Sequence, residues 1–458
     1  MLPPSSPQFL LLLLTFFFLS SLLLTPTHSQ IPPPYLKLRL LHKPPTSNPS
    51  LFLSSDSHRL SSLRSRIVSG ASAGSGQYLV DFRIGSPPQT LLLVADTGSD
   101  LVWAKCSACR NCSRHAPGAT FLARHSSTFS PFHCSSRACR LAPPPAPPTP
   151  VPACNRTRLH SSCRFQQTYA DQSTASGLFS HDVATLNASD GREIKVKNLA
   201  FGCGFRAAGP SFQGSQGVMG LGRGPISFAT QIGRRFGNNV FSYCLMDYTL
   251  APPPSSYLII GGAARHHLRR RHPTGRPFRY SFTPLRSNPL SPTFYYIQIV
   301  SVSVDGKALP IDPSVWDLDP NGNGGTVVDS GTTLTFLPEA AYREVMAAFR
   351  RRARLPRAAA PAGSGFDLCV NATGVRHPRL PRLELRLLGG AALVPPPRNY
   401  FIDVAEGVKC AAMQAVSAAA QAAGGFSVIG NLMQQGFLFV FDRDQNSLAF
   451  SRTGCSLS

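Results

Sequence analysis

Short runs of β-forming residues, most of them closed by Gly, Pro or Asn, dominate the chain from residue 77 onward. The clearest runs are YLVDFRI (78–84), LLLVA (91–95), IKVKNLAF (194–201), FYYIQIVSVSVDG (294–306), FLFVFD (437–442) and SLAFS (447–451). Runs of β-branched and aromatic residues bounded by turn-forming residues are typical of strands. The pattern therefore predicts an all-β protein.

Two segments have a helical pattern instead. They are PISFATQIGRR (225–235) and PEAAYREVMAAFRRRA (338–353), and each begins with a proline. Proline is favoured at the first position of a helix, where its missing N–H has no partner to lose. We expect a few short helices within the β structure.

The pattern of the first 74 residues predicts a signal peptide and a propeptide, both of which are cleaved off during maturation. Residues 9–24 are apolar and are followed by small residues near Ser29. A run of this length suits a signal peptide (1–29) better than a membrane span, which needs about 20 residues. An uncleaved anchor is the alternative. Residues 30–74 are rich in Pro, Ser and basic side chains and predict a mobile, cleavable propeptide. We expect secretion and no membrane span in the mature form.

An aspartate twice follows an apolar run that reads as the end of a buried strand. Asp96 stands in LLLVADTGSDLVWAKC and Asp329 in GGTVVDSGTTLTFLPE, 233 positions later. Each is followed by an apolar-apolar-Gly turn, which ends at Gly220 in the first case and at Gly430 in the second. Two matched pairs in the same order indicate a duplication, and so a bilobal protein with a pseudo-two-fold axis.

The duplication places the N-terminal lobe at 75–264 and the C-terminal lobe at 280–458, with a basic connector at 265–279. One aspartate from each lobe then meets the other at the axis. Carboxylates held this close cannot both ionise, so they share one proton. One acts as general base on a water molecule and the other as general acid. The glycines after each aspartate allow close approach of the backbone.

These residues resemble the pepsin-like aspartic protease family, in particular its plant nepenthesin-type members. DTGSDLVW and DSGTT are similar to the two active-site motifs of the family, and the resemblance spans roughly Gln77 to Cys455. It implies an all-β, bilobal pepsin-like fold with a few short helices, and an aspartic endopeptidase with no cofactor. It assigns catalysis to Asp96 and Asp329 and active-site support to Thr97, Gly98, Ser99, Ser330, Gly331 and Thr332.

The resemblance also implies a flap over the substrate. YADQSTASG is similar to the flap of the family, which makes Tyr169 the residue that closes over a bound peptide. Trp103 matches the tryptophan that supports this tyrosine. Polypeptides, cut beside bulky apolar residues at acidic pH, are the expected substrates, and a monomer is the expected state. The expected location is extracellular, in the apoplast or cell wall, with the vacuole or a plastid as alternatives.

Twelve cysteines, an even number, fit the disulfide framework of a secreted protein. A zinc site in CSACRNC (106–112) is the alternative, but it needs reduced thiolates. The family resemblance implies a Cys369–Cys410 disulfide and a separate knot from Cys106 to Cys163. Four N-x-[ST] sequons begin at Asn111, Asn155, Asn187 and Asn371. All twelve cysteines are disulfide candidates, namely Cys106, Cys109, Cys112, Cys134, Cys139, Cys154, Cys163, Cys203, Cys244, Cys369, Cys410 and Cys455.

The formal net charge is +23, of which residues 30–74 contribute +5, which leaves +18 for the rest of the chain. Such a surface attracts polyanions, for example acidic cell-wall polymers. Two arginine runs, 265–279 and 349–357, read as a solvated loop and a helix end. They lack the interleaved aromatic residues of a single-strand nucleic-acid surface. A proline-rich insertion at 141–154 predicts an extended surface loop.

Two alternatives stay open beside the enzyme. The first is a protease-fold protein that has lost catalysis and binds or inhibits another protein, as the xylanase-inhibitor relatives of the family do. The second is a polyanion-binding protein, which does not exclude proteolysis. Two single residues are not assigned to catalysis: Ser72 stands in a chance G-x-S-x-G match, and Asp100 is either structural or solvent-facing.

Overall fold

The computed structural model describes the part of the chain that carries the β-rich pattern. It covers residues 35–42, 76–110, 120–145, 154–157, 161–169, 172–188, 191–209, 212, 215–236, 238–247, 255–261, 279–362, 364–416, 425–453 and 455. The predicted signal peptide lies outside these residues. So do most of the predicted propeptide, the centre of the proline-rich insertion and the basic connector up to residue 278.

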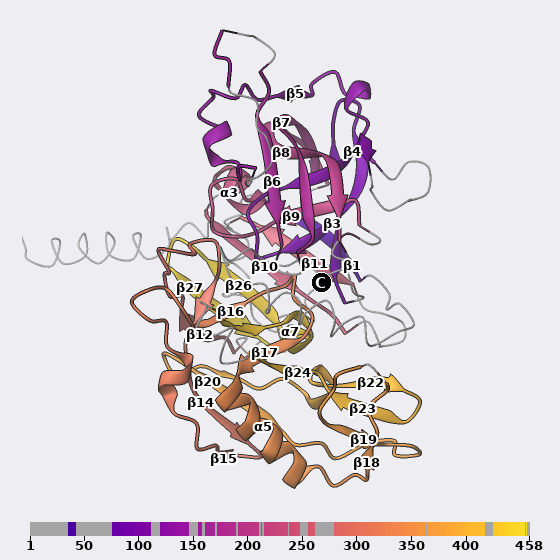
Figure 1. The fold of residues 1–458 in the computed structure, drawn as a ribbon, viewed down its shortest axis with the longest axis vertical. Coiled ribbons are helices and arrows are strands. Elements are labelled where there is room, and N and C mark those ends of the chain that lie inside the picture. Colours follow the sequence, from indigo (N-terminus) through magenta and orange to yellow (C-terminus); the bar gives the residue numbers. More distant parts are fainter. Residues whose placement is uncertain are drawn as a thin grey trace, which may run out of the picture. The chain divides into compact units, whose positions relative to one another are not determined.

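The largest sheet has fourteen strands and contains elements of both halves of the chain (Figure 1). Its order is β12-β27-β26-β10-β11-β1-β2-β3-β9-β4-β8-β7-β5, with β6 paired to β7. From the first half come β1 (Leu36–His42), β2 (Tyr78–Ile84), β3 (Gln89–Asp96), β4 (Trp103–Arg110), β5 (Ser130–Pro131), β6 (Arg164–Thr168), β7 (Thr174–Asn187), β8 (Glu193–Ala208), β9 (Gly217–Gly220), β10 (Val240–Cys244) and β11 (Ser256–Ile260).

The second half adds three strands to this sheet and forms three smaller sheets. The three strands are β12 (Ser281–Pro284), β26 (Leu438–Asp442) and β27 (Ser447–Ser451). The smaller sheets have the orders β13-β16-β25-β17-β24, β15-β14-β20-β21 and β18-β19-β23-β22. Their strands are β13 (Tyr296–Ile297), β14 (Ile299–Val304), β15 (Lys307–Ala308), β16 (Thr326–Val328), β17 (Thr335–Pro338), β18 (Arg357–Ala358), β19 (Cys369–Asn371), β20 (Leu383–Leu387), β21 (Ala392–Leu393), β22 (Phe401–Ala405), β23 (Val408–Ala411), β24 (Met413–Val416) and β25 (Ser427–Ile429). The mainly β, two-lobed architecture confirms the predicted fold class.

The helices in the described residues are short. The predicted helix at 225–235 begins three residues late, as α3 (Phe228–Gly233), and continues as η4 (Arg234–Phe236). The second helix, α5 (Glu339–Arg352), has Pro338 as its N-cap, and its last turn holds three arginines of the second arginine run. Positive charges in the last turn are favourable because the C-terminal end of a helix dipole is negative. The remaining helical turns are η1 (Ala123–His125), η2 (Cys139–Leu141), η5 (Pro313–Trp316), η6 (Pro397–Asn399) and α7 (Asn431–Gln434).

Strand β1 corrects the expectation that all of residues 30–74 are mobile. It lies between β11 and β2, with Leu36 opposite Ile260 and Leu40 opposite Val80. Leu36, Leu38 and Leu40 are buried. Leucine at every second position is the period of a strand with one buried face, and this signal was available in LKLRLLH. Part of the predicted propeptide is therefore an internal strand of the main sheet.

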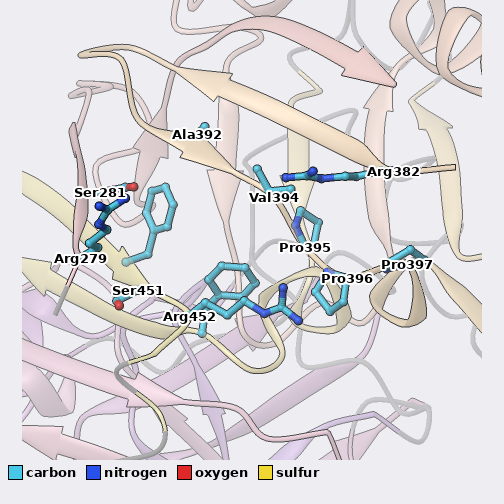
Figure 2. A pocket seen from close by; sticks show the side chains of 12 residues that line it. Arg279, Ser281, Arg382, Ala392, Val394, Pro395, Pro396, Pro397, Ser451 and Arg452 are labelled. Atoms are coloured by element: carbon cyan, nitrogen blue, oxygen red, sulfur yellow. The ribbon is translucent and has the colours of Figure 1, made fainter. Parts of the chain in front are cut away.

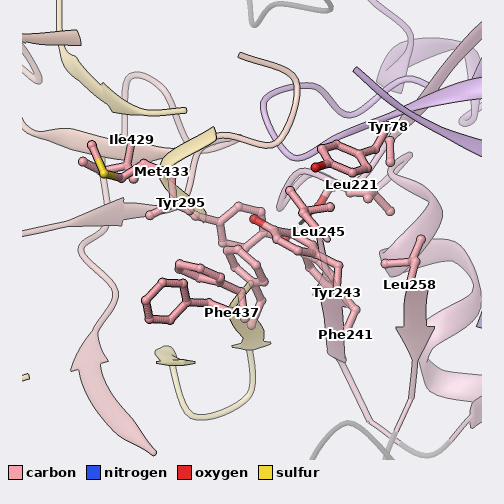
Figure 3. Close-up of a cluster of buried hydrophobic side chains, with 14 of the residues drawn as sticks. Tyr78, Leu221, Phe241, Tyr243, Leu245, Leu258, Tyr295, Ile429, Met433 and Phe437 are labelled. Atoms are coloured by element: carbon pink, nitrogen blue, oxygen red, sulfur yellow. Dashed lines mark hydrogen bonds between the residues drawn. The ribbon is translucent and has the colours of Figure 1, made fainter. Parts of the chain in front are cut away.

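An aromatic core joins the two halves where β10 pairs with β26. Phe241 lies opposite Phe441, and their rings stack with centroids 4.7 Å apart. Tyr295, from the second half, packs edge-on against both rings. Figure 3 shows Phe241 and Tyr295 together with Tyr243, Leu245 and Phe437. Burial of this much aromatic surface makes the junction between the halves part of the hydrophobic core.

Five disulfides lie within the described residues, Cys369–Cys410 among them. The expected self-contained knot is wrong in one respect, because Cys106 pairs with Cys203 and so joins β4 to β8. Parallel pairing of those two strands brings positions 97 residues apart to adjacent places, which local spacing does not reveal. The other pairs are Cys134–Cys154, Cys139–Cys163 and Cys244–Cys455. Cys112 lies outside the described residues.

Within the described ranges, none of the helices has the length and apolarity that a bilayer crossing requires.

The Cys369–Cys410 disulfide closes a loop of 41 residues. We expect the double variant Cys369→Ser/Cys410→Ser to lose up to about 4 kcal/mol of unfolding free energy, because the unfolded chain regains the entropy of that loop. Urea unfolding without reductant measures the loss. An unchanged unfolding midpoint would contradict a stabilising role for this bond.

Candidate active site

Asp96 and Asp329 stand at equivalent ends of equivalent strand pairs. Asp96 is the last residue of β3. This strand runs parallel to β9, and Asp96 lies opposite Gly220 in the pairing. Asp329 follows β16, which runs parallel to β25, and its N–H donates to Ile429 O at 3.2 Å. The match extends to the two glycine turns that sequence analysis paired. The duplication is therefore a geometric repeat as well as a sequence repeat.

The first carboxylate is buried and held by two fixed donors. Asp96 is 0% exposed. Its Oδ1 accepts from Gly98 N–H at 3.0 Å, and its Oδ2 accepts from the Ser99 hydroxyl at 2.5 Å. Hydrogen bonds of this kind stabilise the charged form and fix the plane of the carboxylate.

The second carboxylate has the same donors at the same spacing. Asp329 is 3% exposed. Its Oδ1 accepts from Gly331 N–H at 2.8 Å, and its Oδ2 accepts from the Thr332 hydroxyl at 2.5 Å. Each aspartate thus binds the N–H two positions later and the hydroxyl three positions later.

A reciprocal pair of hydroxyl contacts connects the two loops. Thr97 N–H donates to Ser330 Oγ at 3.1 Å, and Ser330 N–H donates to Thr97 Oγ1 at 2.9 Å. Each hydroxyl then donates across to the opposite strand, to Val328 O at 3.3 Å and to Ala95 O at 2.9 Å. All four contacts cross from one half of the chain to the other. They place the residues next to Asp96 and Asp329 against each other.

The glycines of the two turns are required by close packing. A Cβ on Gly220 would lie 2.4 Å from the carbonyl carbon of Asp100, and one on Gly430 would lie 2.0 Å from Leu334 O. Any side chain there would push the active-site loop away. This explains why the same residue type recurs at both positions.

Trp103 and Tyr169 form one buried unit. The Trp103 indole N–H donates to the Tyr169 hydroxyl at 2.6 Å, and both side chains are at most 1% exposed. Phe212 packs edge-on against both rings. Tyr169 follows β6 in the hairpin turn to β7, where its N–H donates to Ser173 O. The next two residues of the turn lie outside the described residues.

Lys105 supports this unit, and sequence analysis missed it. Its side chain is 0% exposed, and its ammonium donates to Phe212 O and to Ser215 O, both at 2.9 Å. It therefore holds the segment that carries Phe212 against the Trp103–Tyr169 pair. A signal was present, because Lys105 lies two positions after Trp103 on the same face of a strand. A lysine on a buried face needs hydrogen-bond acceptors.

A second contact that sequence analysis missed reaches Asp329 from the first half. The Tyr243 hydroxyl donates to Gln434 Oε1, and Gln434 Nε2 donates to Asp329 O at 3.1 Å. Burial raises the pKa of Tyr243 well above its usual value, and the charge of Asp329 raises it further. Tyr243 therefore stays a neutral donor that supports the backbone of Asp329 through Gln434.

Asp100 is structural, and the solvent-facing alternative is wrong. Its carboxylate accepts from Gly224 N–H and from the Thr293 hydroxyl, each at 2.8 Å. Thr293 belongs to the second half, so this half-buried contact also joins the halves. Burial raises the pKa of the Asp100 carboxyl, and the two hydrogen bonds and the charge of Arg443 offset this only in part.

Among the described residues, one group of candidate metal ligands lies in the cysteine-rich region. His133, Cys134 and Cys154 lie close enough to hold an ion, but the two cysteines form a disulfide with each other. Cys106 is likewise bonded, to Cys203. A bonded sulfur is not the thiolate that zinc requires.

Comparison with known proteins agrees with this geometry. Residues 78–262 match the family model described as the N-terminal part of xylanase inhibitors, and residues 294–452 match the C-terminal part. Aspartyl protease family protein 2 of Arabidopsis thaliana is 37% identical over 395 residues, which cover 86% of this chain and 74% of that protein. Aspartic proteinase nepenthesin-1 of Nepenthes gracilis is 32% identical over 84% of this chain and 80% of its own length.

Solved structures share the fold. A crystal structure of EDGP superposes with a TM-score of 0.67 at 21% identity, over 94% of this chain and 97% of that one. Basic 7S globulin from soybean gives a TM-score of 0.62 at 20% identity, over 92% and 97% of the two chains. At this identity the likeness concerns the fold alone.

Fold, paired loops and relatives together define a bilobal protein of the aspartic protease class. The chain belongs to the plant pepsin-like aspartic protease family, the family of nepenthesin-1.

The raised pKa of Asp100 predicts a pH-dependent stability. Because its pKa in the folded state lies above the ordinary value of 3.8, the folded protein holds this proton more tightly than the unfolded chain does. The stability contributed by the neutral carboxyl is therefore lost as pH rises from about 4 through the raised pKa. We expect Asp100→Asn to gain stability relative to the unmodified protein over this interval.

Urea unfolding at a series of pH values measures the difference between the two proteins. Asp81→Asn is the matched control, because Asp81 is exposed on β2. Parallel curves for Asp100→Asn and the unmodified protein would show that Asp100 does not titrate differently in the folded state.

Proposed function

We propose that the protein is a secreted aspartic endopeptidase that uses Asp96 and Asp329 to activate a water molecule. The observation that carries the proposal is the repeat of one carboxylate geometry in two loops that the Thr97 and Ser330 hydroxyls join. Two carboxylates at such a junction share a proton. One then takes a proton from water as general base while the other protonates the carbonyl oxygen of the peptide bond.

The support residues act on the carboxylates and not on the substrate. Gly98, Ser99, Gly331 and Thr332 give every carboxylate oxygen one fixed donor. A carboxylate oxygen can accept two hydrogen bonds, so one fixed donor does not by itself exclude a contact with water or a shared proton. Because the donors are already in place, little reorganisation is needed when charge shifts during the reaction.

Polypeptides with bulky apolar residues beside the cut bond are the proposed substrates, at acidic pH. Tyr169, Trp103 and Phe212 form an apolar unit at the base of the proposed flap. That unit is itself buried, so its role is to position the flap. Apolar substrate side chains buried beneath the flap would supply binding energy of about 25 cal/mol per Å². An acidic optimum follows from the need to keep one proton on the pair of carboxylates.

The proposed route includes removal of residues 1–29 as a signal peptide, secretion and activation of a zymogen. The disulfides support an oxidising compartment, and the sequons Asn155, Asn187 and Asn371 are exposed. Asn111 lies outside the described residues. The apoplast or cell wall is the proposed destination, with the vacuole or a plastid as alternatives. A monomer with a polyanion-binding basic surface is the proposed state.

A catalytically weak binding or inhibitor protein is the second candidate, and the names of the matching family models favour it. The two carboxylates, their donors and the Trp103–Tyr169 pair are all retained here, which favours the enzyme. An activity assay separates the two.

We expect Asp96→Asn and Asp329→Asn each to reduce turnover of a denatured protein substrate by at least about a hundred-fold, because neither amide serves as acid or base. Assays between about pH 3 and pH 7 measure the loss. Asp81→Asn, which removes an exposed carboxylate, serves as control. Full turnover in either active-site variant, with folding intact, would refute the mechanism.

Tyr169 allows a test of the flap. Tyr169→Ala would empty a buried site and cost about 3 kcal/mol of stability as well. We therefore expect the clearer result from Tyr169→Phe, which keeps the ring but leaves the Trp103 N–H without its acceptor. Turnover should fall by roughly ten-fold. Unchanged kcat and KM in this variant would show that the Trp103–Tyr169 bond does not position the flap.

A further inference from the structure

A pocket of about 450 Å³ lies in the second half of the chain, apart from the aspartates (Figure 2). Arg279, Arg382 and Arg452 line it, and they come from three separate places in the sequence. Figure 2 shows Arg382 and Arg452 on two sides of the proline segment 395–397. Three cations around one small cavity repel one another unless an anion lies between them.

None of the three guanidinium groups forms an ion pair with a carboxylate among the residues that the structure describes. Asp305 forms a hydrogen bond with one of these arginines, but only with its main chain: Asp305 Oδ1 accepts from the backbone N–H of Arg382. The other carboxylate oxygen of Asp305, Oδ2, lies 3.9 Å from Nε of Arg352. The positive charge of the pocket is therefore not neutralised by these contacts.

Apart from Ser281 and Ser451, the rest of the lining is apolar. Phe437 and Phe450 lie against each other with ring centroids 6.5 Å apart, and both line the pocket. Pro395, Pro396 and Pro397 line it as well, with main chains restricted by their rings. An apolar lining with a few converging polar groups is the composition of a small-molecule site.

We propose that this pocket binds a small organic anion that carries at least two carboxylates on a body of rings. Each guanidinium presents a planar fork of donors that matches a carboxylate with two parallel hydrogen bonds. Val394, Pro396 and Pro397 are partly exposed in the lining and offer apolar contact to a ring, whereas a bare inorganic anion would leave them without contact. The volume is in the lower part of the range of ligand pockets, which fits a short oligomer rather than a folded partner.

An oligosaccharide of uronic acids has this chemistry, because each sugar ring carries one carboxylate. Trigalacturonate is the probe that we choose, and isothermal titration at low salt is the measurement. We expect saturable binding that weakens as salt is added. Maltotriose has similar rings without carboxylates, and inorganic phosphate has charge without rings. Neither should bind comparably.

Variants assign the binding to the pocket. We expect Arg382→Gln and Arg452→Gln each to weaken binding of trigalacturonate by about ten-fold or more, since each removes a charge-assisted contact. Arg140→Gln removes the same charge from an exposed position in the first half and should change affinity little. Ala392→Phe keeps every charge but fills the cavity that Ala392 lines, and it should abolish binding.

Each of the following results would overturn the proposal: no binding to the unmodified protein, equal weakening by Arg140→Gln, or phosphate binding as tightly as trigalacturonate. Retained binding in Ala392→Phe would place the anion on the general basic surface, which also contradicts the pocket. Repeating the titration with Asp96→Asn separates this proposal from proteolysis, because the affinity should be the same in that variant.

Discussion

The reciprocal contact between Thr97 and Ser330 is the constraint on which the candidate site depends. It joins two loops separated by 233 positions and is built from hydroxyls and backbone N–H groups that are buried. Such groups need partners when they leave water, and each loop supplies the partners of the other. A change in one loop therefore leaves a buried donor or acceptor of the other loop without its hydrogen-bond partner. The positions of the two aspartates are therefore coupled.

The two halves of the chain are also joined by contacts outside the active-site loops, and these contacts help to hold the halves together. Phe241 and Phe441 stack where β10 pairs with β26. Asp100 binds Thr293, and Tyr243 reaches the backbone of Asp329 through Gln434. Because these contacts use different chemistry, a change of salt or of pH does not weaken all of them equally. High salt or low pH acts on the charged groups and leaves the aromatic packing in place.

The repeat made the fold class and the paired aspartates predictable from the sequence. Asp96 and Asp329 each carry local signals, namely an apolar run before and a glycine after, and these signals occur twice. The disulfide of Cys106 and the role of Asp100 were not predictable in this way, since each depends on a partner that only the folded chain brings near. The leucines of β1 carried a local signal of burial but stood in a segment expected to be mobile, and Lys105 carried such a signal without being noticed. What they contact is again a matter of tertiary structure.

The disulfide between Cys244 and Cys455 has a topological consequence. It closes a covalent ring of chain with a sequence separation of 211, and this ring contains nearly all of the second half, including Asp329. One cut of the backbone anywhere inside the ring opens it without dividing the molecule, so both pieces stay on one covalent framework. Two aspartates on formally separate polypeptides would then still be held in one molecule, and the nick would show only after reduction.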